Sequence, residues 1–305
     1  MNQPQDIYAE LASQFNLMQD EPMKRHTSFR IGGPADLFAQ PRNVIELKEI
    51  LKEAARHDIP ITLIGGGTNL LITDSGIRGL VISTTKLKPG IRIIEQSSGS
   101  ALVRAEAGEL LPRMVRFTAE NGLSGIEFAA GIPGTIGGAV IMNAGTPDGC
   151  MADVIDMVEV LNPETLEVEI LSAARLEFGY RASSIDGILL AVSLTLTPGS
   201  RLEIEAAVRD AISRKKKSQP VSEASAGCFF KNPSPENPAG KLIEAAGLKG
   251  LTVNDAKVSE CHANYLVNTG NASCSDMLEL KKKVEQAVMN KFQIKLETEV
   301  RVKGE

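Results

Sequence analysis

The most informative stretch of the chain is Ile126-Glu-Phe-Ala-Ala-Gly-Ile-Pro-Gly-Thr-Ile-Gly-Gly-Ala-Val-Ile-Met-Asn-Ala-Gly145. It sets glycines at 131, 134, 137 and 138 within an apolar segment, and Pro133 fixes φ among them. Glycine permits positive φ and lets a ligand approach the backbone closely. No residue between 130 and 144 carries a formal charge, so a bound anion would be held by backbone N–H groups. The run indicates a ligand-cradling loop, and a turn between two buried strands is the alternative.

A second glycine run follows the short apolar segment Pro60-Ile-Thr-Leu-Ile64 and reads Gly65-Gly-Gly-Thr-Asn-Leu-Leu71. A strand that ends in a glycine corner brings phosphate close to backbone amides. The run is not a P-loop, because no Gly-Lys-Ser/Thr follows, and Leu70 replaces the third glycine of a Rossmann fingerprint. Two such loops suggest one long anionic ligand held at two places, and a dinucleotide has that shape.

The composition fits a folded soluble protein large enough for two domains. The chain has 305 residues, 43% of them hydrophobic, and a net charge of −5, which argues against general nucleic-acid binding. No apolar run reaches membrane-spanning length, and the first residues lack a signal-peptide pattern, so we expect a cytoplasmic protein. The four cysteines show no Cys-x-x-Cys spacing, so we expect neither a metal site nor a disulfide framework.

Local patterns predict helices and strands along the whole chain. Asn43 caps an apolar helical face, and the residues around Asn162-Pro-Glu-Thr165 form a predicted hairpin turn. The first twenty residues look like a loosely attached helix. The predicted helices are 44–54, 110–121, 204–217, 239–246 and 275–292. The predicted strands are 61–64, 79–83, 101–107, 154–161, 166–171, 188–196, 264–268 and 295–303.

Further motifs occur in a fixed order from about residue 22 to 303. They are Thr27-Ser-Phe-Arg-Ile-Gly-Gly-Pro-Ala-Asp36, Gly179-Tyr-Arg181, Gly227-Cys-Phe-Phe-Lys-Asn-Pro233, Ala239-Gly-Lys-Leu-Ile243 and Leu296-Glu-Thr-Glu-Val-Arg301. Together with the glycine loops, they closely resemble the UDP-N-acetylenolpyruvoylglucosamine reductase family, flavoenzymes that make UDP-N-acetylmuramate for peptidoglycan. Phe178-Gly-Tyr-Arg181 runs directly into Ala-Ser-Ser, without a tyrosine-bearing insertion, so the shorter subtype is the better match.

The resemblance implies an α+β fold of two domains. A FAD-binding domain of the vanillyl-alcohol-oxidase/PCMH type, made of two α+β subdomains, would span 22–200, with subdomains at about 22–85 and 86–200. A C-terminal α+β substrate-binding domain would span 201–305, and its last strand could return to the FAD domain. Residues 1–21 would be an N-terminal extension.

The resemblance also implies the cofactor and the reaction. FAD would bind non-covalently and take hydride from NADPH, and the enolpyruvyl group of the UDP-sugar would then be reduced. NADPH and the UDP-sugar are the expected small-molecule partners, and we expect a monomer without nucleic-acid or membrane partners. The implied cofactor-binding residues are Arg30, Ile64, Gly65, Gly66, Gly67, Thr68, Asn69, Leu70, Gly131, Ile132, Pro133, Gly134, Gly137 and Gly138.

Three positions of the family's catalytic motifs fall on Arg181, Cys228 and Glu299. Arg181 would clamp the substrate carboxylate, because a planar guanidinium binds it bidentately. Cys228 would protonate the substrate α-carbon, although many members of the family have serine there. Glu299 would lie beside the carboxylate or the enolate. Each could instead be structural: a surface ion pair, a buried thiol or a strand-face carboxylate.

The remaining candidates would bind the substrate. Lys217, Lys231 and Asn232 would contact its pyrophosphate and sugar, and a solvated helix end is the expected role of Lys215 and Lys216. The full predicted substrate set is Tyr180, Lys217, Lys231, Asn232, His262 and Asn264. A structural histidine is the alternative for His262.

Three other functions compete with this interpretation. Another FAD-dependent oxidase or dehydrogenase of the same fold would share the glycine loops. A thiol hydrolase could combine Cys228 with His262 and Asn264, but it would leave both glycine loops without a role. A non-catalytic nucleotide-binding module would keep the loops and need none of the three catalytic residues. Flavin absorbance and its response to NADPH distinguish these classes.

Overall fold

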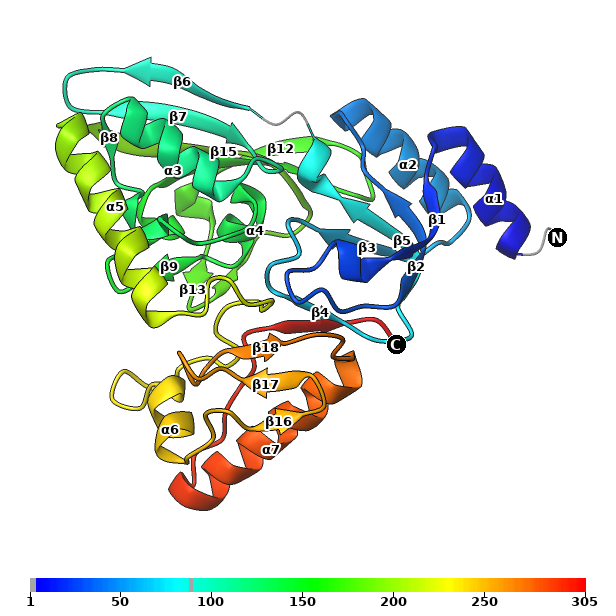
Figure 1. The fold of residues 1–305 in the computed structure, drawn as a ribbon. Coiled ribbons are helices and arrows are strands. Elements are labelled where there is room, and N and C mark those ends of the chain that lie inside the picture. Colours follow the sequence, from blue (N-terminus) through cyan, green and yellow to red (C-terminus); the bar gives the residue numbers. More distant parts are fainter. Residues whose placement is uncertain (1–3, 88–89) are drawn as a thin grey trace. The chain divides into compact units, whose positions relative to one another are not determined.

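The computed structural model describes residues 4–87 and 90–305, which form two compact units (Figure 1). The first unit comprises the described residues up to 17 together with 38–66 and 81–214. The second comprises 18–37, 67–80 and 215–305. The described α-helices are α1 Pro4–Phe15, α2 Val44–Arg56, α3 Leu111–Glu120, α4 Ile136–Ile141, α5 Arg201–Ser218, α6 Ala239–Ala245 and α7 Cys274–Phe292. Short 3-10 helices lie at Met23–Arg25, Thr84–Lys86, Glu127–Ala129, Met151–Asp153 and Ala173–Arg175.

An antiparallel sheet of order β12-β11-β15-β7-β6 dominates the first unit, and β8 also pairs with β15. Its central strand β15 sets Val192 opposite Val158 of β11 and Ala105 of β7. The small pairs β9–β10 and β13–β14 are hairpins. The strands of this unit include β3 Ile61–Ile64, β6 Ile91–Gln96, β7 Ala101–Glu106, β8 Leu123–Ser124, β9 Gly145–Thr146, β10 Gly149–Cys150, β11 Ile155–Leu161, β12 Val168–Ser172, β13 Phe178–Gly179, β14 Ala182–Ser183 and β15 Ile188–Pro198.

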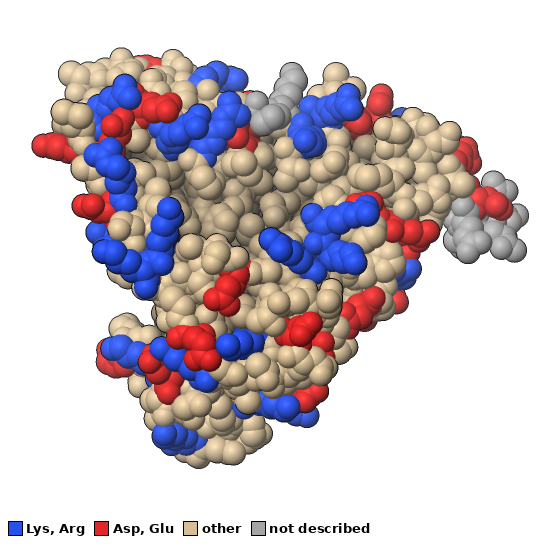
Figure 2. Space-filling view, in the orientation of Figure 1, with Lys and Arg blue, Asp and Glu red and all other residues tan. Residues whose placement is uncertain are grey.

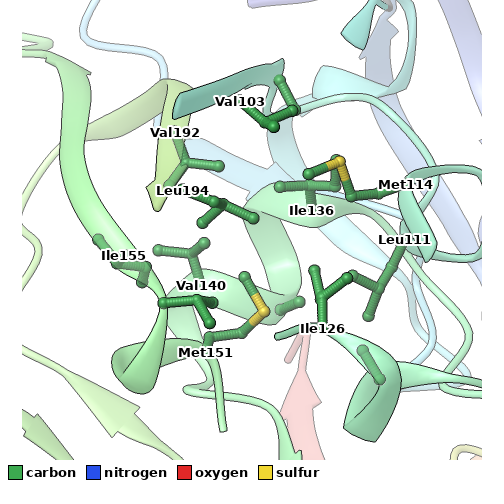
Figure 3. Close-up of a cluster of buried hydrophobic side chains, with 14 of the residues drawn as sticks. Val103, Leu111, Met114, Ile126, Ile136, Val140, Met151, Ile155, Val192 and Leu194 are labelled. Atoms are coloured by element: carbon green, nitrogen blue, oxygen red, sulfur yellow. The ribbon is translucent and has the colours of Figure 1, made fainter. Parts of the chain in front are cut away.

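Alternation along the strands supplies the core of the first unit. In β7, Ala101, Val103 and Ala105 are buried, whereas the residues between them are partly exposed. Helix α4 contacts β7 and β15, and α3 contributes Leu111 and Met114. Figure 3 shows these side chains meeting in one cluster with residues from β11 and β15. This core fixes the start of α4, where the glycine-rich run ends.

A four-stranded sheet of order β1-β2-β5-β3 is built from the first 83 residues. Its other strands are β1 Met18–Pro22, β2 Pro34–Ala39 and β5 Ile77–Ser83. Helix α2 begins as predicted, because the Asn43 side chain accepts from the Glu46 amide at 2.9 Å. Helix α1 buries Leu11 and Ala12, so it is packed more firmly than the sequence suggested.

The second unit combines a small antiparallel sheet, β16-β17-β18, with α6 and α7. Phe29 and Phe229 meet edge to face in its core, with ring centroids 6.2 Å apart. Strand β19 pairs in parallel with β4, setting Val302 opposite Leu71. The strands are β4 Leu70–Ile72, β16 Thr252–Val253, β17 Ala256–Val258, β18 Leu266–Asn268 and β19 Arg301–Lys303.

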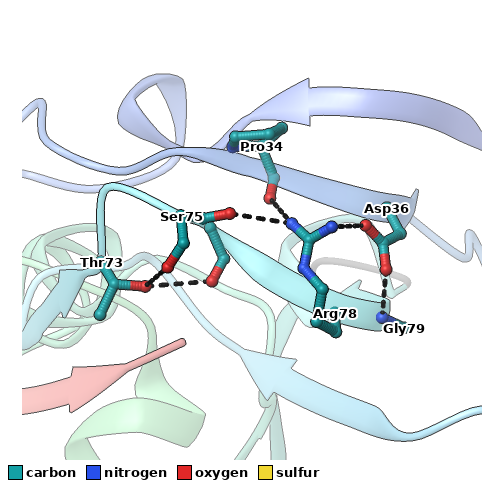
Figure 4. Close-up of polar contacts among 7 residues, drawn as sticks. Pro34, Asp36, Thr73, Ser75, Arg78 and Gly79 are labelled. Atoms are coloured by element: carbon teal, nitrogen blue, oxygen red, sulfur yellow. Dashed lines mark hydrogen bonds and ion pairs between the residues drawn. The ribbon is translucent and has the colours of Figure 1, made fainter. Parts of the chain in front are cut away.

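The turn between β4 and β5 is held by polar contacts shown in Figure 4. The Arg78 guanidinium pairs with Asp36 and donates to the carbonyl oxygens of Pro34 and Ser75. The other Asp36 oxygen accepts from the Gly79 amide at 2.8 Å. These bonds fix the chain immediately after β4.

The N-terminus of α7 is capped twice. Ser273 and Asp276 form a capping box, in which Ser273 Oγ accepts from the Asp276 amide at 3.0 Å. Asp74 accepts from the amides of Cys274 and Ser275 at 2.7 and 3.0 Å. The β4–β5 turn is therefore attached to the longest helix of the second unit.

Most predicted elements are confirmed, and two strands were predicted too long: 264–268 pairs only over Leu266–Asn268, and 295–303 only over Arg301–Lys303. Residues 295–300 form no strand. Their pairing is limited to an isolated bridge between Thr298 and Phe230. Both Glu299 and Val300 donate to the Phe229 carbonyl, and the chain bends there before pairing begins at Arg301.

Basic and acidic side chains are interspersed over the face shown in Figure 2. None of the helices within the described residues is long and apolar enough to cross a membrane.

Candidate active site

The two glycine loops predicted from the sequence touch each other in the first unit. A Cβ added at Gly65 would lie 2.5 Å from Thr135 Oγ1, and one at Gly66 would lie 3.1 Å from Gly134 Cα. Such distances leave no room for side chains, so the glycines are required for the close approach. The loops come together because Ile64, the buried last residue of β3, leads directly into Gly65, and Thr135 caps α4.

Hydrogen bonds within the protein hold the second loop in shape. Gly131 and Gly134 have φ of +76° and +110°, as a glycine-dependent turn requires. The Gly137 amide donates to Ala107 O at 2.8 Å, and the Gly138 amide donates to Thr135 Oγ1 at 3.2 Å. These two amides are therefore bonded within the protein, and an anion bound to the backbone of this run would use its other N–H groups.

The end of the first loop packs on the segment that begins at His26. Gly67 has a φ of +65°, and a Cβ there would overlap the His26 carbonyl oxygen. The Ser28 amide donates to Gly67 O at 3.2 Å. In the described part of the chain, Ser28 Oγ is the buried side-chain oxygen without a hydrogen-bond partner. The neighbouring Arg30 is exposed, with a φ of +57°.

Arg181 lies at the turn between β13 and β14, in the first unit. Its φ is +59°, its Nη2 donates to Gly145 O at 3.1 Å, and its Cζ lies 4.9 Å from the Tyr180 ring centroid. Asn143 fixes the hairpin by donating to Gly179 O at 3.1 Å. Tyr180 itself is 53% exposed. The turn therefore presents a guanidinium held by the backbone and an exposed aromatic ring.

Cys228 and Glu299 lie near each other in the second unit because both adjoin Phe229. Cys228 precedes Phe229 in the chain, and Glu299 hydrogen-bonds to it. The Phe229 amide donates to Asn264 O at 2.7 Å, and its carbonyl accepts from the Glu299 amide at 2.9 Å. Cys228 immediately precedes Phe229, whose amide and carbonyl are both hydrogen-bonded, and it is partly exposed. The preceding Gly227 has a φ of +79°. The predicted acid and the predicted carboxylate thus lie on adjacent backbone segments.

Tyr265 joins this pair, although no local sequence motif points to it. Its hydroxyl hydrogen-bonds to the Cys228 side chain. Burial, and then the negative charges of Cys228 and Glu299, raise the pKa of the Tyr265 phenol. The phenol therefore stays protonated and acts as a hydrogen-bond donor.

Two predicted substrate contacts also bond to the backbone of the second unit. Asn264 is buried, and its side chain bonds both to the Phe230 amide at 3.0 Å and to the Phe230 carbonyl at 2.8 Å. Asn232 accepts from the Ala239 amide at 3.1 Å, at the start of α6. The Asn264 side chain is bonded to Phe230 and so does not orient His262 as a thiol hydrolase would require; only the Asn264 backbone amide donates to His262 Nδ1, at 3.2 Å.

The other predicted contacts are more open. Lys231 pairs with Glu297 at 3.7 Å with 38% of its side chain exposed, and Lys217 is exposed on the last turn of α5. Burial, and then the charge of Lys249, lower the pKa of His262, whose ring meets Tyr265 edge to face at 5.1 Å. We expected Lys215 to be solvated, but it is partly buried, and burial lowers its pKa to about 8. Within the described residues, no group of three or more His, Cys, Asp or Glu could hold a metal ion.

Comparison with known proteins identifies the family. Residues 219–303 match the profile of the UDP-N-acetylenolpyruvoylglucosamine reductase C-terminal domain, and residues 35–170 match that of a FAD binding domain. The reductase of Moorella thermoacetica is 43% identical, with 95% of this chain and 94% of that protein covered. That of Clostridioides difficile is 42% identical over 99% of each chain. The chain belongs to the UDP-N-acetylenolpyruvoylglucosamine reductase family.

A solved structure supports the same assignment. The UDP-N-acetylenolpyruvylglucosamine reductase of Thermus caldophilus superposes with a TM-score of 0.78 at 36% identity, covering 94% of this chain and 99% of that one. The predicted family, the α+β fold with a FAD-binding domain and the flavin-dependent oxidoreductase class are therefore confirmed. Cys228, Tyr265 and Glu299 all fall within the segment matched to the reductase C-terminal domain.

The residues fit the FAD that this family's fold implies. The two loops lie in contact, with Gly65 against Thr135 Oγ1, so one long ligand would be able to reach both of them. The unpaired Ser28 hydroxyl beside Gly67 is a polar group that a ligand could satisfy. Asn69 belongs to the same loop, and its amide donates to Glu299 O at 3.2 Å. The predicted cofactor loop is thus bonded directly to the predicted catalytic strand.

Proposed function

We propose that this protein reduces UDP-N-acetylglucosamine enolpyruvate to UDP-N-acetylmuramate, using NADPH as the reductant and non-covalent FAD. The observation that carries the proposal is the convergence of Cys228 and Glu299 on Phe229, in a chain of the reductase family. A conjugate reduction needs a proton donor and a stabiliser of the developing enolate, and a thiol with a neighbouring carboxyl group supplies both functions.

Arg181, Cys228 and Glu299 would act on the substrate. Arg181 binds the carboxylate, because its guanidinium stays charged and matches two oxygens at once. Cys228 gives its proton to the α-carbon. Glu299 lies where it can stabilise the enolate as an acid or through a water. The positive φ of Arg181 and its bond to Gly145 O hold the guanidinium for this task.

The two glycine loops and Arg30 would hold the cofactor. When bound, FAD supplies two-electron chemistry, taking hydride from NADPH and giving it to the enolpyruvyl group. The loops keep the backbone close to the dinucleotide, and no histidine or cysteine in them offers a point of covalent attachment.

The UDP-sugar would be bound by the open polar residues. Lys217 and Lys231 suit its pyrophosphate, and Tyr180 and His262 suit its rings. Asn232 and Asn264 support this region as backbone anchors. We further infer a monomer in the cytoplasm, where NADPH and sugar nucleotides are available. The domains would follow the ranges predicted above, with the division near residue 200.

Absorbance of the purified protein tests the proposal. We expect a flavin spectrum, release of all colour as FAD on acid precipitation, and anaerobic bleaching by NADPH. The enolpyruvyl UDP-sugar should then restore the colour, whereas oxygen should do so slowly. A colourless protein would exclude a flavoenzyme, and colour kept in the acid pellet would exclude non-covalent FAD. Rapid reoxidation by oxygen alone would favour an oxidase.

A further inference from the structure

The bonding around Phe229 sets a third residue beside the proposed acid. Because the Phe229 amide donates to Asn264 O, the segment after Gly227 runs alongside the segment that contains Asn264 and Tyr265. The pairing continues between Ala224 and Asn268, which form an isolated antiparallel bridge. The bond from Phe229 to Asn264 places Cys228 next to Tyr265 across the paired segments, and the Ala224–Asn268 bridge holds the same two segments at a second point.

The Tyr265 side chain is held on several sides. It is only 8% exposed, and its ring packs edge to face on His262. Its amide donates to His262 O at 2.9 Å, and its carbonyl accepts from the Ser259 amide at 2.9 Å. The ionisable groups facing its hydroxyl are Cys228, Glu299 and Cys261. A phenol fixed in this way has a defined direction for its hydrogen bond.

We propose that Tyr265 is a positioning residue for Cys228, with its hydroxyl donating a hydrogen bond to Sγ. This inference rests on the proposed function for its role in the reaction. The S–H bond breaks, its proton forms the new C–H bond at the substrate α-carbon, and its electron pair stays on sulfur. The Tyr265 hydroxyl keeps its own proton and stabilises the thiolate until water returns a proton to it.

Burial suits Tyr265 to this role. A phenol that lost its proton would become a hydrogen-bond acceptor and would repel the thiolate. Burial and the nearby negative charges raise the pKa of Tyr265, so the hydroxyl remains a donor throughout the neutral range. Hydrogen bonds to a charged partner are about twice as strong as neutral ones, so the contact strengthens when the thiolate forms.

The decisive test is the reactivity of Cys228 in the holoenzyme. Tyr265→Phe keeps the ring and removes the hydroxyl, and Tyr8→Phe is the matched control. Alkylation by iodoacetamide is followed against pH, with each cysteine resolved by mass spectrometry. We expect the midpoint for Cys228 in Tyr265→Phe to move to higher pH by about one unit. Tyr8→Phe should leave it unchanged.

The other cysteines report on folding in the same samples. Burial, and then Asp74, raise the pKa of Cys274 to about 12, so its thiol should stay unreactive near pH 8 while the second unit is folded. A Cys228 profile that stays unchanged in a variant with unreactive Cys274 would overturn the proposal. If Tyr265→Phe does not fold, wild-type protein made with 3-fluorotyrosine replaces it. Fluorine strengthens the phenol as a donor, so the Cys228 midpoint should move to lower pH, and no movement would again overturn the proposal.

A second readout connects the contact to the reaction. Reoxidation of pre-reduced Tyr265→Phe by the enolpyruvyl substrate should slow about tenfold, while flavin reduction by NADPH changes less than about twofold. An unchanged reoxidation rate would overturn the role in proton transfer. If wild-type enzyme itself failed to reduce the substrate, the proposed function would fall. The thiol profile would then still decide whether Tyr265 positions Cys228.

Discussion

At position 228 the chain carries a thiol that follows a glycine with a φ of +79°. No atom outside the adjacent residues lies within 4 Å of the place where a Cβ on Gly227 would stand, so the glycine serves the backbone turn and not packing. The turn leaves the Cys228 side chain partly exposed beside Glu299 and Tyr265. A thiol has a pKa near 8.5 and so gives up its proton far more readily than a serine hydroxyl does.

This chemistry gives a prediction for two substitutions of Cys228. Cys228→Ser keeps a proton donor and should remain active. Cys228→Ala removes the donor and should slow reoxidation by substrate about 10²–10⁴-fold, the usual contribution of a general acid. Single-turnover reoxidation of pre-reduced enzyme measures this step. Flavin reduction by NADPH is the internal control and should be normal in both variants. An alanine variant that reoxidises at the wild-type rate would leave Cys228 as a pocket-lining residue.

The sequence could point to Cys228 and Glu299 but not to their neighbour. Each lies in a motif that can be read locally, whereas the contact of Tyr265 depends on the register between segments about 35 residues apart. For the neighbouring Asn264 the resemblance implies a substrate contact, which stays a prediction. The bonds of its side chain to the Phe230 backbone become visible only when the two segments pair.

At the scale of elements, the contact between the glycine loops is the feature most sensitive to one added methyl group. Thr135 is buried, and its Oγ1 accepts from the Gly138 amide, so it cannot turn away without uncapping α4. Gly65→Ala would force its Cβ against this oxygen, and overpacking of this kind typically costs about 1–3 kcal/mol. The strain would separate the two loops that form the proposed cradle.

We therefore predict that Gly65→Ala weakens FAD binding by about tenfold or more. Titration of the apoprotein with FAD measures the affinity. Gly99→Ala is the matched control, because no atom outside its neighbours lies within 4 Å of a Cβ placed there. Wild-type affinity in Gly65→Ala would mean that the loops do not hold the cofactor as a pair.

Elements with local signals were predictable, and elements that depend on distant pairing were less so. Helix α2 carries its own N-cap, and α3 has Pro112 in its first turn, so both were found close to their observed bounds. The hairpin of β11 and β12 follows from its turn residues. The sequence predicts strand β19 over 295–303, because apolar and polar residues alternate through this whole range. Residues 297–300 instead make isolated backbone hydrogen bonds to Phe229 and Lys231 and form no ladder.

At the scale of the whole molecule, the second unit is assembled from three separate stretches of sequence. Its residues come from 18–37, 67–80 and 215–305. The composition change after residue 200 predicts one boundary there, and it does not point to the two earlier stretches, because these join the second unit through pairing with distant residues. The parallel pairing of β19 with β4 is one such contact. It places residues 301–303 beside the strand that follows Asn69 in the sequence.

This pairing gives the last prediction. The Arg301 amide donates to Asn69 O at 3.0 Å, and the Asn69 side chain donates to Glu299 O at 3.2 Å. Arg301→Pro removes the first donor and restricts the preceding residue, so it should lower the free energy of unfolding by about 1–3 kcal/mol. Arg301→Ala keeps the amide and is the matched control. Urea unfolding measures the stability of both variants.

Binding of FAD should respond in the same direction, because Asn69 belongs to the loop predicted to hold the cofactor. If β19 positions that loop, Arg301→Pro will bind FAD more weakly than Arg301→Ala, even at urea concentrations where both variants remain folded. Loss of stability with unchanged FAD affinity would show that β19 only supports the second unit. The catalytic strand and the cofactor loop would then be coupled by stability alone, and not by the geometry of the Asn69 contacts.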